Sequence, residues 1–257
     1  MKRDEHKAFI KSRLFEMMQE AFCVINQLGD GMEFYAASNY LLHSVFLQMT
    51  GAQEQKMKCI CWELATDNLK YRYERYYKGW SLNQCSTLED KCHVYEDLVK
   101  HIKSKDCLYK IFADTAAKVA FRDKILRDMN NLFEKTNIAK LYQKNYEAFN
   151  GMFSVMSVGN ITPSEKLLFK KGNKDNPVYG ADTDTELFAV YSLLYEHRNR
   201  CAHNTLSYQL NLPNLNLLRD DKYQKYNNLF VFFAVLIMID EIMICLFNKY
   251  ELLQLTF

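Results

Sequence analysis

The 257-residue sequence contains few residues that interrupt helices, with three prolines and eight glycines. Proline breaks a helix interior and glycine weakens it, so their scarcity favours long, continuous helices. No segment alternates apolar and polar residues in the way that predicts a strand. Aromatic residues form 14% of the chain, which excludes the composition of a disordered protein. We therefore predict an all-α protein that folds as a helical bundle.

The sequence also lacks a large excess of charge of either sign, because its formal net charge is +2. Any affinity for nucleic acid must then come from a local patch rather than from the field of the whole protein. The phosphate loop GxxxxGK[ST], the dinucleotide motif GxGxxG, the zinc motif HExxH and the nucleophile motif GxSxG are all missing. Their absence argues against nucleoside triphosphate hydrolysis and dinucleotide redox chemistry.

The cysteines show no spacing that is typical of a metal site, and no CxxC pair occurs. Cys59-x-Cys61 and Cys85-x6-Cys92 are poor spacings for zinc. The first residues lack the apolar core of a secretory signal peptide. We expect a cytoplasmic protein with reduced thiols packed mostly as small hydrophobic groups, and neither a metal nor another cofactor. The eight cysteines are Cys23, Cys59, Cys61, Cys85, Cys92, Cys107, Cys201 and Cys245.

Apolar residues at steps of three and four predict amphipathic helices along most of the chain. The predicted ranges are 5–28, 34–49, 53–77, 88–104, 106–149 with interruptions, a helix following residue 184, and about 221–252. Gly51 is either a break or a soft spot, and Thr87 resembles a helix start. Turns or loops are expected at 79–87, 159–163 and 170–184. We expect one domain over 1–257, with an N-terminal helical part at about 1–158 and a second part at about 159–257.

The helix that follows residue 184 has a buried stripe formed by Leu187, Val190, Tyr191 and Leu194. Continuing this stripe by four residues reaches Arg198, which therefore lies on the packed side of the helix. An unpaired charge is costly in that position. The pattern predicts that Arg198 either has an anionic partner or belongs to a binding site.

Around Arg198 the chain reads Tyr-Glu-His-Arg-Asn-Arg-Cys-Ala-His-Asn, from Tyr195 to Asn204. Arg198 is a permanent cation that can bind phosphate bidentately, and His203 can transfer protons near neutral pH. This string resembles the R-x(4–6)-H signature of the HEPN superfamily, most of whose active members are endoribonucleases of toxin–antitoxin, abortive-infection and antiviral systems. The finer pattern Arg-Asn-x-Cys-Ala-His is similar to that of the Abi-like abortive-infection branch. The clear resemblance covers roughly the last third of the chain.

The resemblance implies a metal-independent endoribonuclease whose substrate is RNA. Arg198 would stabilise charge that develops on the phosphoryl oxygens, and His203 would take or give the proton. Asn199 would orient this pair through hydrogen bonds. The products would carry 2′,3′-cyclic phosphate ends. Such proteins function in antiviral defence or toxin–antitoxin systems, so an antitoxin or another regulatory partner is also expected.

The spacing of Arg198 and His203 sets a geometric condition. Residues five apart in a continuous helix differ by about 140° around its axis, so the two side chains would not converge. Either the helix ends near 199–202, or two copies of the motif form one site. The family forms its site across a two-fold dimer interface and this chain has one motif, so we expect a homodimer.

Several further features leave alternatives open. The apolar run at 229–247 has nearly the length of a membrane span, but Asp240 and Glu241 within it favour a buried helix and no membrane. The strip at 70–80 interleaves cations with aromatics and is either an RNA contact or a half-buried helix face. Lys170, Lys171 and Lys174 are a second possible RNA contact. The family packs the helix that carries Glu54 near its site, so the resemblance makes Glu54 a weaker candidate for orienting Arg198, with an ordinary solvated acid as the alternative.

Two other functional classes stay open. The first is a catalytically inactive HEPN-like module that binds RNA or another protein. The second is a membrane-associated defence effector.

Overall fold

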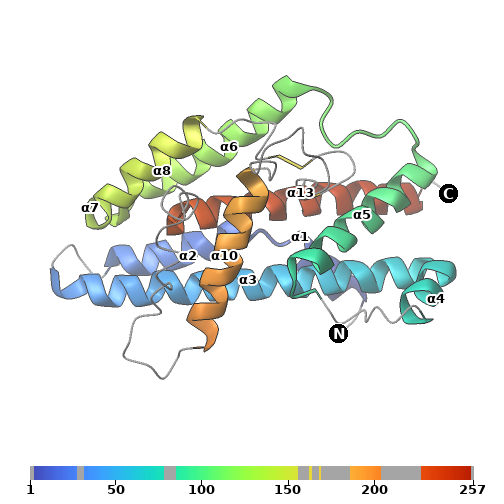
Figure 1. Cartoon of the computed structure of the whole chain (residues 1–257), viewed down its shortest axis with the longest axis horizontal. Helices are drawn as coiled ribbons and strands as arrows, with labels where there is room; N and C mark the ends of the chain where they lie inside the picture. Colours follow the sequence, from blue (N-terminus) through green and yellow to red (C-terminus); the bar gives the residue numbers. More distant parts are fainter. Residues whose placement is uncertain are drawn as a thin grey trace, which may run out of the picture.

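The computed structural model describes residues 3–27, 32–77, 85–155, 162–163, 168, 186–203 and 227–255. Every regular element in these ranges is an α-helix, which confirms the predicted all-α class for the described part of the chain (Figure 1). The helices are α1 (Arg3–Lys11), α2 (Leu14–Gln27), α3 (Met32–Asp67), α4 (Leu69–Tyr77), α5 (Leu88–Lys105), α6 (Thr115–Glu134), α7 (Ile138–Leu141), α8 (Gln143–Val155), α10 (Glu186–His203) and α13 (Leu229–Leu255).

Several predicted features lie outside the described residues. They are most of the turn at 79–87, the polar loop at 170–184 with its three lysines, and the first residues of the helix predicted at 221–252. The break at 159–163 is described only at Thr162 and Pro163. The expected boundary between an N-terminal part and a motif-bearing part therefore stays a prediction.

The helix predicted over 5–28 is divided, because α1 ends at Lys11 and α2 begins at Leu14. A polar contact with distant helices occupies the break. The Leu14 backbone N–H donates to the Asp240 carboxylate over 2.8 Å, and the Lys56 ammonium donates to the Ser12 carbonyl oxygen. These partners satisfy backbone groups that a continuous helix would have paired internally. Local sequence cannot reveal this break, since the partners come from α3 and α13.

At Gly51, where a break was one of the two expected alternatives, α3 continues without interruption through all of its 36 residues. A Cβ atom at Gly51 would have nothing within 4 Å, so no close packing requires glycine there. The chain instead breaks at Asn68, whose side-chain oxygen accepts the Tyr71 backbone N–H and so begins α4. The start predicted for α5 is confirmed, since Thr87 and Asp90 form a reciprocal capping box.

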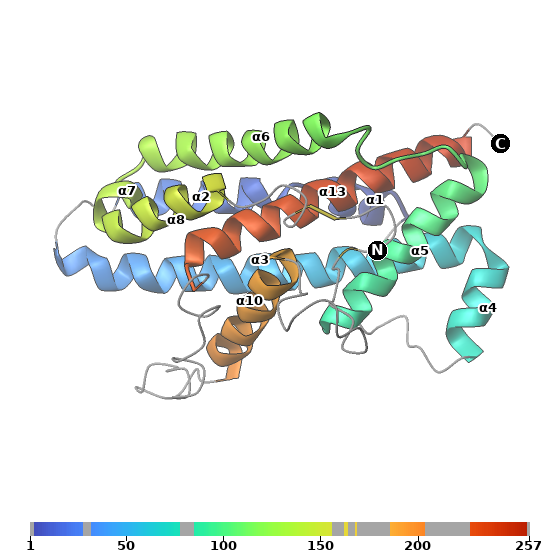
Figure 2. The ribbon, with the colours of Figure 1, turned by 45° about the horizontal axis from the view of Figure 1, so that its top comes forward.

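Helix α13 is the centre of the bundle, and every residue from Phe230 to Asp240 is buried. Figure 2 shows α3 and α13 running alongside each other, and α13 also contacts α1, α2, α5, α6, α8 and α10. By length and composition α13 is the one described helix that could cross a membrane, yet 78% of its most apolar window is buried inside the protein. A helix apolar on all sides requires such surroundings.

Two of the three acidic residues of α13, Asp240 and Glu241, are paired with cations from distant parts of the chain. Asp240 lies 2.6 Å from the Lys56 ammonium, and Glu241 lies 2.5 Å from the Arg13 guanidinium. Buried charges need such partners. These pairs fix the rotation of α13 relative to α2 and α3, and thereby the surface on which α10 rests.

Candidate functional site

Helix α10 carries the Arg198–His203 string and crosses both α3 and α13 (Figure 1). Its buried stripe is the predicted one, with Leu187, Val190, Tyr191 and Leu194 in the core. A hydrogen-bond relay joins the three helices beneath the site. The Tyr191 hydroxyl donates to the Gln53 side-chain oxygen Oε1 over 2.5 Å, and the Gln53 side-chain NH₂ group donates to the Leu236 backbone carbonyl oxygen over 3.4 Å.

Arg198 has the anionic partner that its place on the packed side predicts. One of its terminal nitrogens lies 3.2 Å from Glu54 Oε1, on α3. The other donates to the Asn199 side-chain oxygen over 3.1 Å. Arg198 is 24% exposed and Glu54 is 12% exposed, so solvent screens the pair only in part. Glu54, the candidate that the family resemblance suggested, contacts Arg198, and Asn199 hydrogen-bonds Arg198.

A second cation, Lys91 of α5, shares the Glu54 carboxylate at 3.9 Å. Its ammonium also donates to the carbonyl oxygens of Cys85, over 3.0 Å, and Ser86, over 2.9 Å, and lies 5.7 Å from the centre of the Tyr195 ring. Burial lowers the pKa of Lys91 to about 8, and the positive charge of Arg198 acts in the same direction. Sequence patterns did not single out Lys91, because its position within α5 looks like that of any solvated lysine.

Glu54 is the carboxylate that both cations contact at the junction of α3, α5 and α10, and the nearby Asp90 also favours the charged form of Lys91. Arg198 is half-buried, and electrostatic attraction is stronger there than at an exposed surface. Arginine has five N–H donors, and Glu54 with Asn199 engages only some of them. This arrangement is suited to binding a phosphate group.

The position of His203 relative to Arg198 follows from the course of α10. The helix runs without interruption from Glu186 to His203, so it does not end between residues 199 and 202. The two positions then differ by about 140° around one axis. The side chain of His203 lies outside the described residues. A site formed by two copies of the motif is the alternative that stays open.

The face of α10 that carries His197 is different in character. The His197 ring packs against Phe46 of α3, Phe232 of α13 and a second histidine, His43 of α3. Burial lowers the pKa of His197 to about 4, and the nearby His43 and Arg200 contribute. His197 is therefore neutral at physiological pH. The Cys201 sulfur lies 3.6 Å from His197 Nε2.

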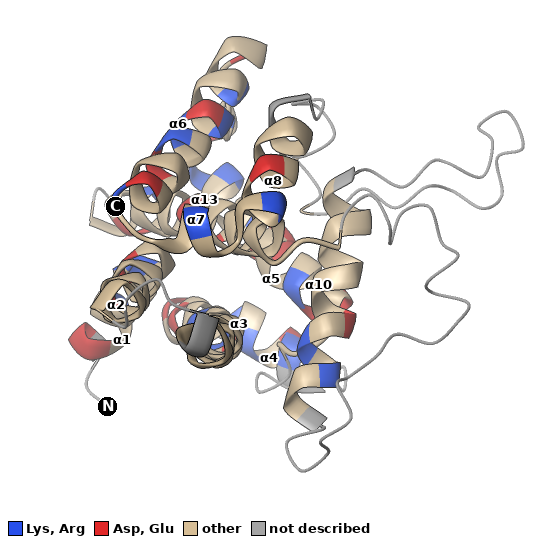
Figure 3. Cartoon of the chain, turned by 90° about the vertical axis from the view of Figure 1, so that its left-hand side faces the viewer, with Lys and Arg blue, Asp and Glu red and all other residues tan. Residues whose placement is uncertain are grey.

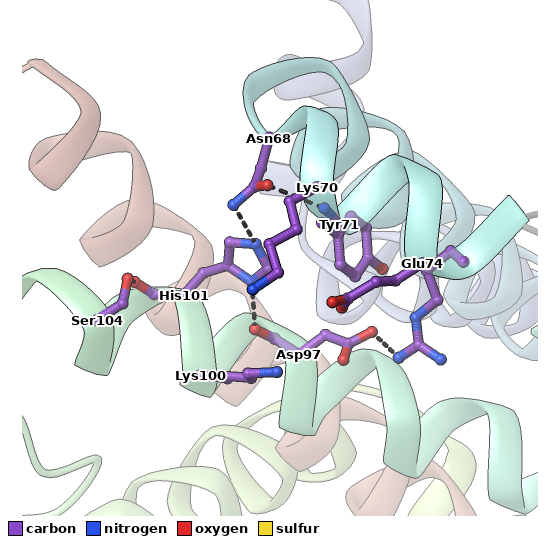
Figure 4. Close-up of a pocket in the computed structure, with 9 residues that line it drawn as sticks. Asn68, Lys70, Tyr71, Glu74, Asp97, Lys100, His101 and Ser104 are labelled. Carbon is purple, nitrogen blue, oxygen red and sulfur yellow. Dashed lines mark hydrogen bonds and ion pairs between the residues drawn. The ribbon is translucent and has the colours of Figure 1, made fainter. Parts of the chain in front are cut away.

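The strip predicted at 70–80 is divided between core and surface. Tyr71 is buried, whereas Tyr73 is 62% exposed. This part of α4 and the facing side of α5 line a cavity of about 410 Å³ (Figure 4). Lys70 and Lys100 lie at this cavity, but Arg75 is paired with Asp97. The cavity mixes both signs of charge, so it resembles a phosphate-binding strip less than the Arg198 site does.

Figure 3 shows Lys and Arg interspersed with Asp and Glu on α6, α8 and α10. Comparison with family models, with curated proteins and with solved structures gives no significant match. Function must then be argued from the site itself.

Proposed function

We propose that this chain is a cytoplasmic, metal-independent endoribonuclease that acts as a homodimer in antiviral defence or a toxin–antitoxin system. The observation that carries the proposal is the half-buried Arg198 beside Lys91, with Glu54 as the carboxylate that both cations share. A scissile phosphate bound there would contact the part-exposed Arg198 guanidinium, and the buried Lys91 would act on it through its charge alone. The resemblance of the 195–204 string to the HEPN signature supplies the reaction class.

In the proposed reaction a base removes the proton of a ribose 2′-hydroxyl, whose oxygen attacks the adjacent phosphorus. The 5′-oxygen of the next nucleotide leaves and receives a proton, so the upstream fragment ends in a 2′,3′-cyclic phosphate. His203 is the proton-transfer residue, and Arg198 stabilises the charge on the phosphoryl oxygens. Asn199 and Glu54 hold the guanidinium in place, so they are positioning residues.

The continuous helix supports a site shared by two chains. Positions 198 and 203 of one α10 are about 140° apart around its axis, which disfavours their meeting at a single phosphate within one protomer. A two-fold arrangement of two α10 helices supplies Arg198 and His203 to one cleft. An antitoxin or regulatory protein that covers this cleft would restrain cleavage.

The second candidate is a catalytically inactive module that binds RNA or a protein partner. It is favoured by one observation, namely that Glu54 and Asn199 already provide Arg198 with partners inside the chain. In that case Arg198 holds α10 against α3, and its loss would weaken the fold rather than a reaction.

The deciding experiment incubates metal-stripped protein with mixed RNA in excess EDTA and analyses the product ends. The proposal predicts 2′,3′-cyclic phosphates, with cleavage at least about 100-fold slower in Arg198→Ala and in His203→Ala. Arg122→Ala on α6 is a matched control, because it removes the same charge from a part-buried ion pair away from α10. Products without cyclic ends, or equal rates in all variants, would contradict the proposal and favour the inactive module.

A further inference from the structure

Three potential metal-binding side chains meet where α10 crosses α3. The spacing of the cysteines in the sequence did not indicate this cluster. One ring nitrogen of His43, one ring nitrogen of His197 and the Cys201 sulfur lie within 4.8 Å of one another. His197 and Cys201 are four residues apart on α10 and so share one helix face. His43 approaches from α3, and its ring centre is 5.4 Å from that of His197.

The distances are close to those of a zinc site. In tetrahedral coordination with Zn–N near 2.0 Å and Zn–S near 2.3 Å, two nitrogens lie about 3.3 Å apart and a nitrogen and a sulfur about 3.5 Å apart. The observed separation of His197 Nε2 and Cys201 Sγ is 3.6 Å. The remaining atom pairs, at no more than 4.8 Å, need to close by about 1.5 Å at most, which side-chain rotation can provide.

The histidine tautomers also fit. His43 Nδ1 lies 2.8 Å from the Asn39 carbonyl oxygen, which can only accept a hydrogen bond. The proton of a neutral His43 is therefore held on Nδ1, and Nε2 keeps its lone pair for a metal. Such a hydrogen bond from the second ring nitrogen to a carbonyl is the usual support of a metal-bound histidine. His197 Nε2 is the nitrogen that faces the Cys201 sulfur.

We propose that His43, His197 and Cys201 form a Zn²⁺ site that ties α10 to α3. Three protein ligands leave a fourth position of the tetrahedron for water. Two of the ligands flank Arg198 in the sequence, so the ion stabilises α10 beside the candidate phosphate site, and cleavage does not require it. Its role is structural, and it differs from the metal-independent chemistry proposed above. Binding displaces the thiol proton of Cys201, since the thiolate is the ligand.

Cobalt(II) is the most direct probe, because a tetrahedral thiolate site gives visible d–d bands and a near-ultraviolet sulfur-to-cobalt band. Metal-stripped protein should bind one Co²⁺ per chain, and Zn²⁺ should displace it. At free Zn²⁺ about 100-fold above the dissociation constant, the folded state gains about 100-fold in its folding equilibrium, which raises Tm by about 5–10 °C.

Cys201→Ser should remove the sulfur-to-cobalt band, and His43→Gln should remove the zinc-dependent rise in Tm. Cys245→Ser and His93→Gln are the matched controls, because they change the same residue types on α13 and α5 away from this cluster. Both controls should bind Co²⁺ as the parent does. Circular dichroism of each metal-free variant verifies that a lost signal is not lost folding, and Cys201→Ser is nearly isosteric.

Three results would overturn the zinc site. They are a parent protein without a stoichiometric cobalt spectrum, a sulfur-to-cobalt band that survives in Cys201→Ser, and a band that disappears equally in Cys245→Ser. None of these measurements uses RNA, so the outcome is independent of whether the chain is a ribonuclease.

Discussion

Glu54 and Lys56 lie two residues apart on α3, and each forms an ion pair with another helix. The two ion pairs differ in the number of cations that contact the carboxylate. Lys56 meets Asp240 of α13 one to one, and their side chains are 5% and 3% exposed. Glu54 meets two cations, Arg198 and Lys91, and Arg198 is 24% exposed. The first pair is closed, whereas in the second the Arg198 guanidinium is part-exposed and a ligand can reach it, although Lys91 is 3% exposed. The difference separates a contact that organises the fold from one that is suited to binding.

The closed pair is not a large source of stability by itself. Burial raises the pKa of Asp240, although Lys56 and the Leu14 N–H oppose this shift. The attraction within the pair therefore does not fully offset the cost of removing the carboxylate from water. Its role is to fix the break between α1 and α2 and the rotation of α13.

The largest expected effect comes from breaking the closed pair. Lys56→Met should destabilise the protein by about 3–5 kcal/mol, because Asp240 then stays buried without its partner. Thermal unfolding should show a decrease in Tm of about 10 °C or more. The double variant Lys56→Met/Asp240→Leu should recover most of this loss. A double variant as unstable as the single one would show that the charges themselves are required.

The next largest effect is expected from mixing two inactive variants, which tests whether two chains share the site. Arg198→Ala and His203→Ala should each be inactive and fold normally, and mixing them should restore part of the activity. The reason is that a mixed dimer contains one cleft with an intact Arg198 and an intact His203. Light scattering of the parent should show a dimer at micromolar concentration. A monomer that cleaves RNA would contradict the shared cleft.

Glu54→Gln, at the ion pair with Arg198, should change RNA binding and the rate of cleavage in opposite directions. Removing the carboxylate charge leaves Arg198 and Lys91 unbalanced, so the KM for RNA should fall. At the same time Arg198 loses the charged carboxylate that orients it, and the neutral amide oxygen of glutamine is a weaker partner, so kcat should fall by about 10-fold. Asp97→Asn, at the Arg75 ion pair of the α4–α5 cavity, is the matched control and should change neither value. A rise in KM with kcat unchanged would show that Glu54 does not position Arg198.

The smallest effect is a pH dependence of RNA binding due to Lys91. Burial holds its pKa at about 8, with Glu54, Cys85 and Asp90 favouring the charged form and Arg198 opposing it. Lys91 is therefore charged at pH 7 and mostly neutral at pH 9, so RNA affinity should decrease across this interval. Lys91→Arg, which stays charged, should flatten the titration. An identical decrease in Lys91→Arg would assign the dependence to another group.

Sequence patterns predicted what local periodicity controls. The all-α class, the Thr87 cap and the burial of the long apolar helix all follow from spacing and residue type. The Glu54–Arg198 contact was also anticipated, but through family resemblance and the cost of an unpaired charge.

The features that were missed depend on contacts between residues far apart in the chain. The break after α1 arises from Lys56 and Asp240, which lie on α3 and α13. Lys91 joins the site because α5 packs against α3, and His43 meets His197 because α10 crosses α3. Each of these residues has an ordinary local pattern, so only the packing of the helices reveals its partners.

The central claim is that Arg198 and His203 cleave RNA without a metal, and product analysis in excess EDTA tests it most directly. Metal-stripped parent protein should release fragments with 2′,3′-cyclic phosphate ends, while Arg198→Ala and His203→Ala leave the RNA intact and Arg122→Ala cuts as the parent does. Cleavage that requires added magnesium or zinc, or that persists in the double variant Arg198→Ala/His203→Ala, would contradict this account.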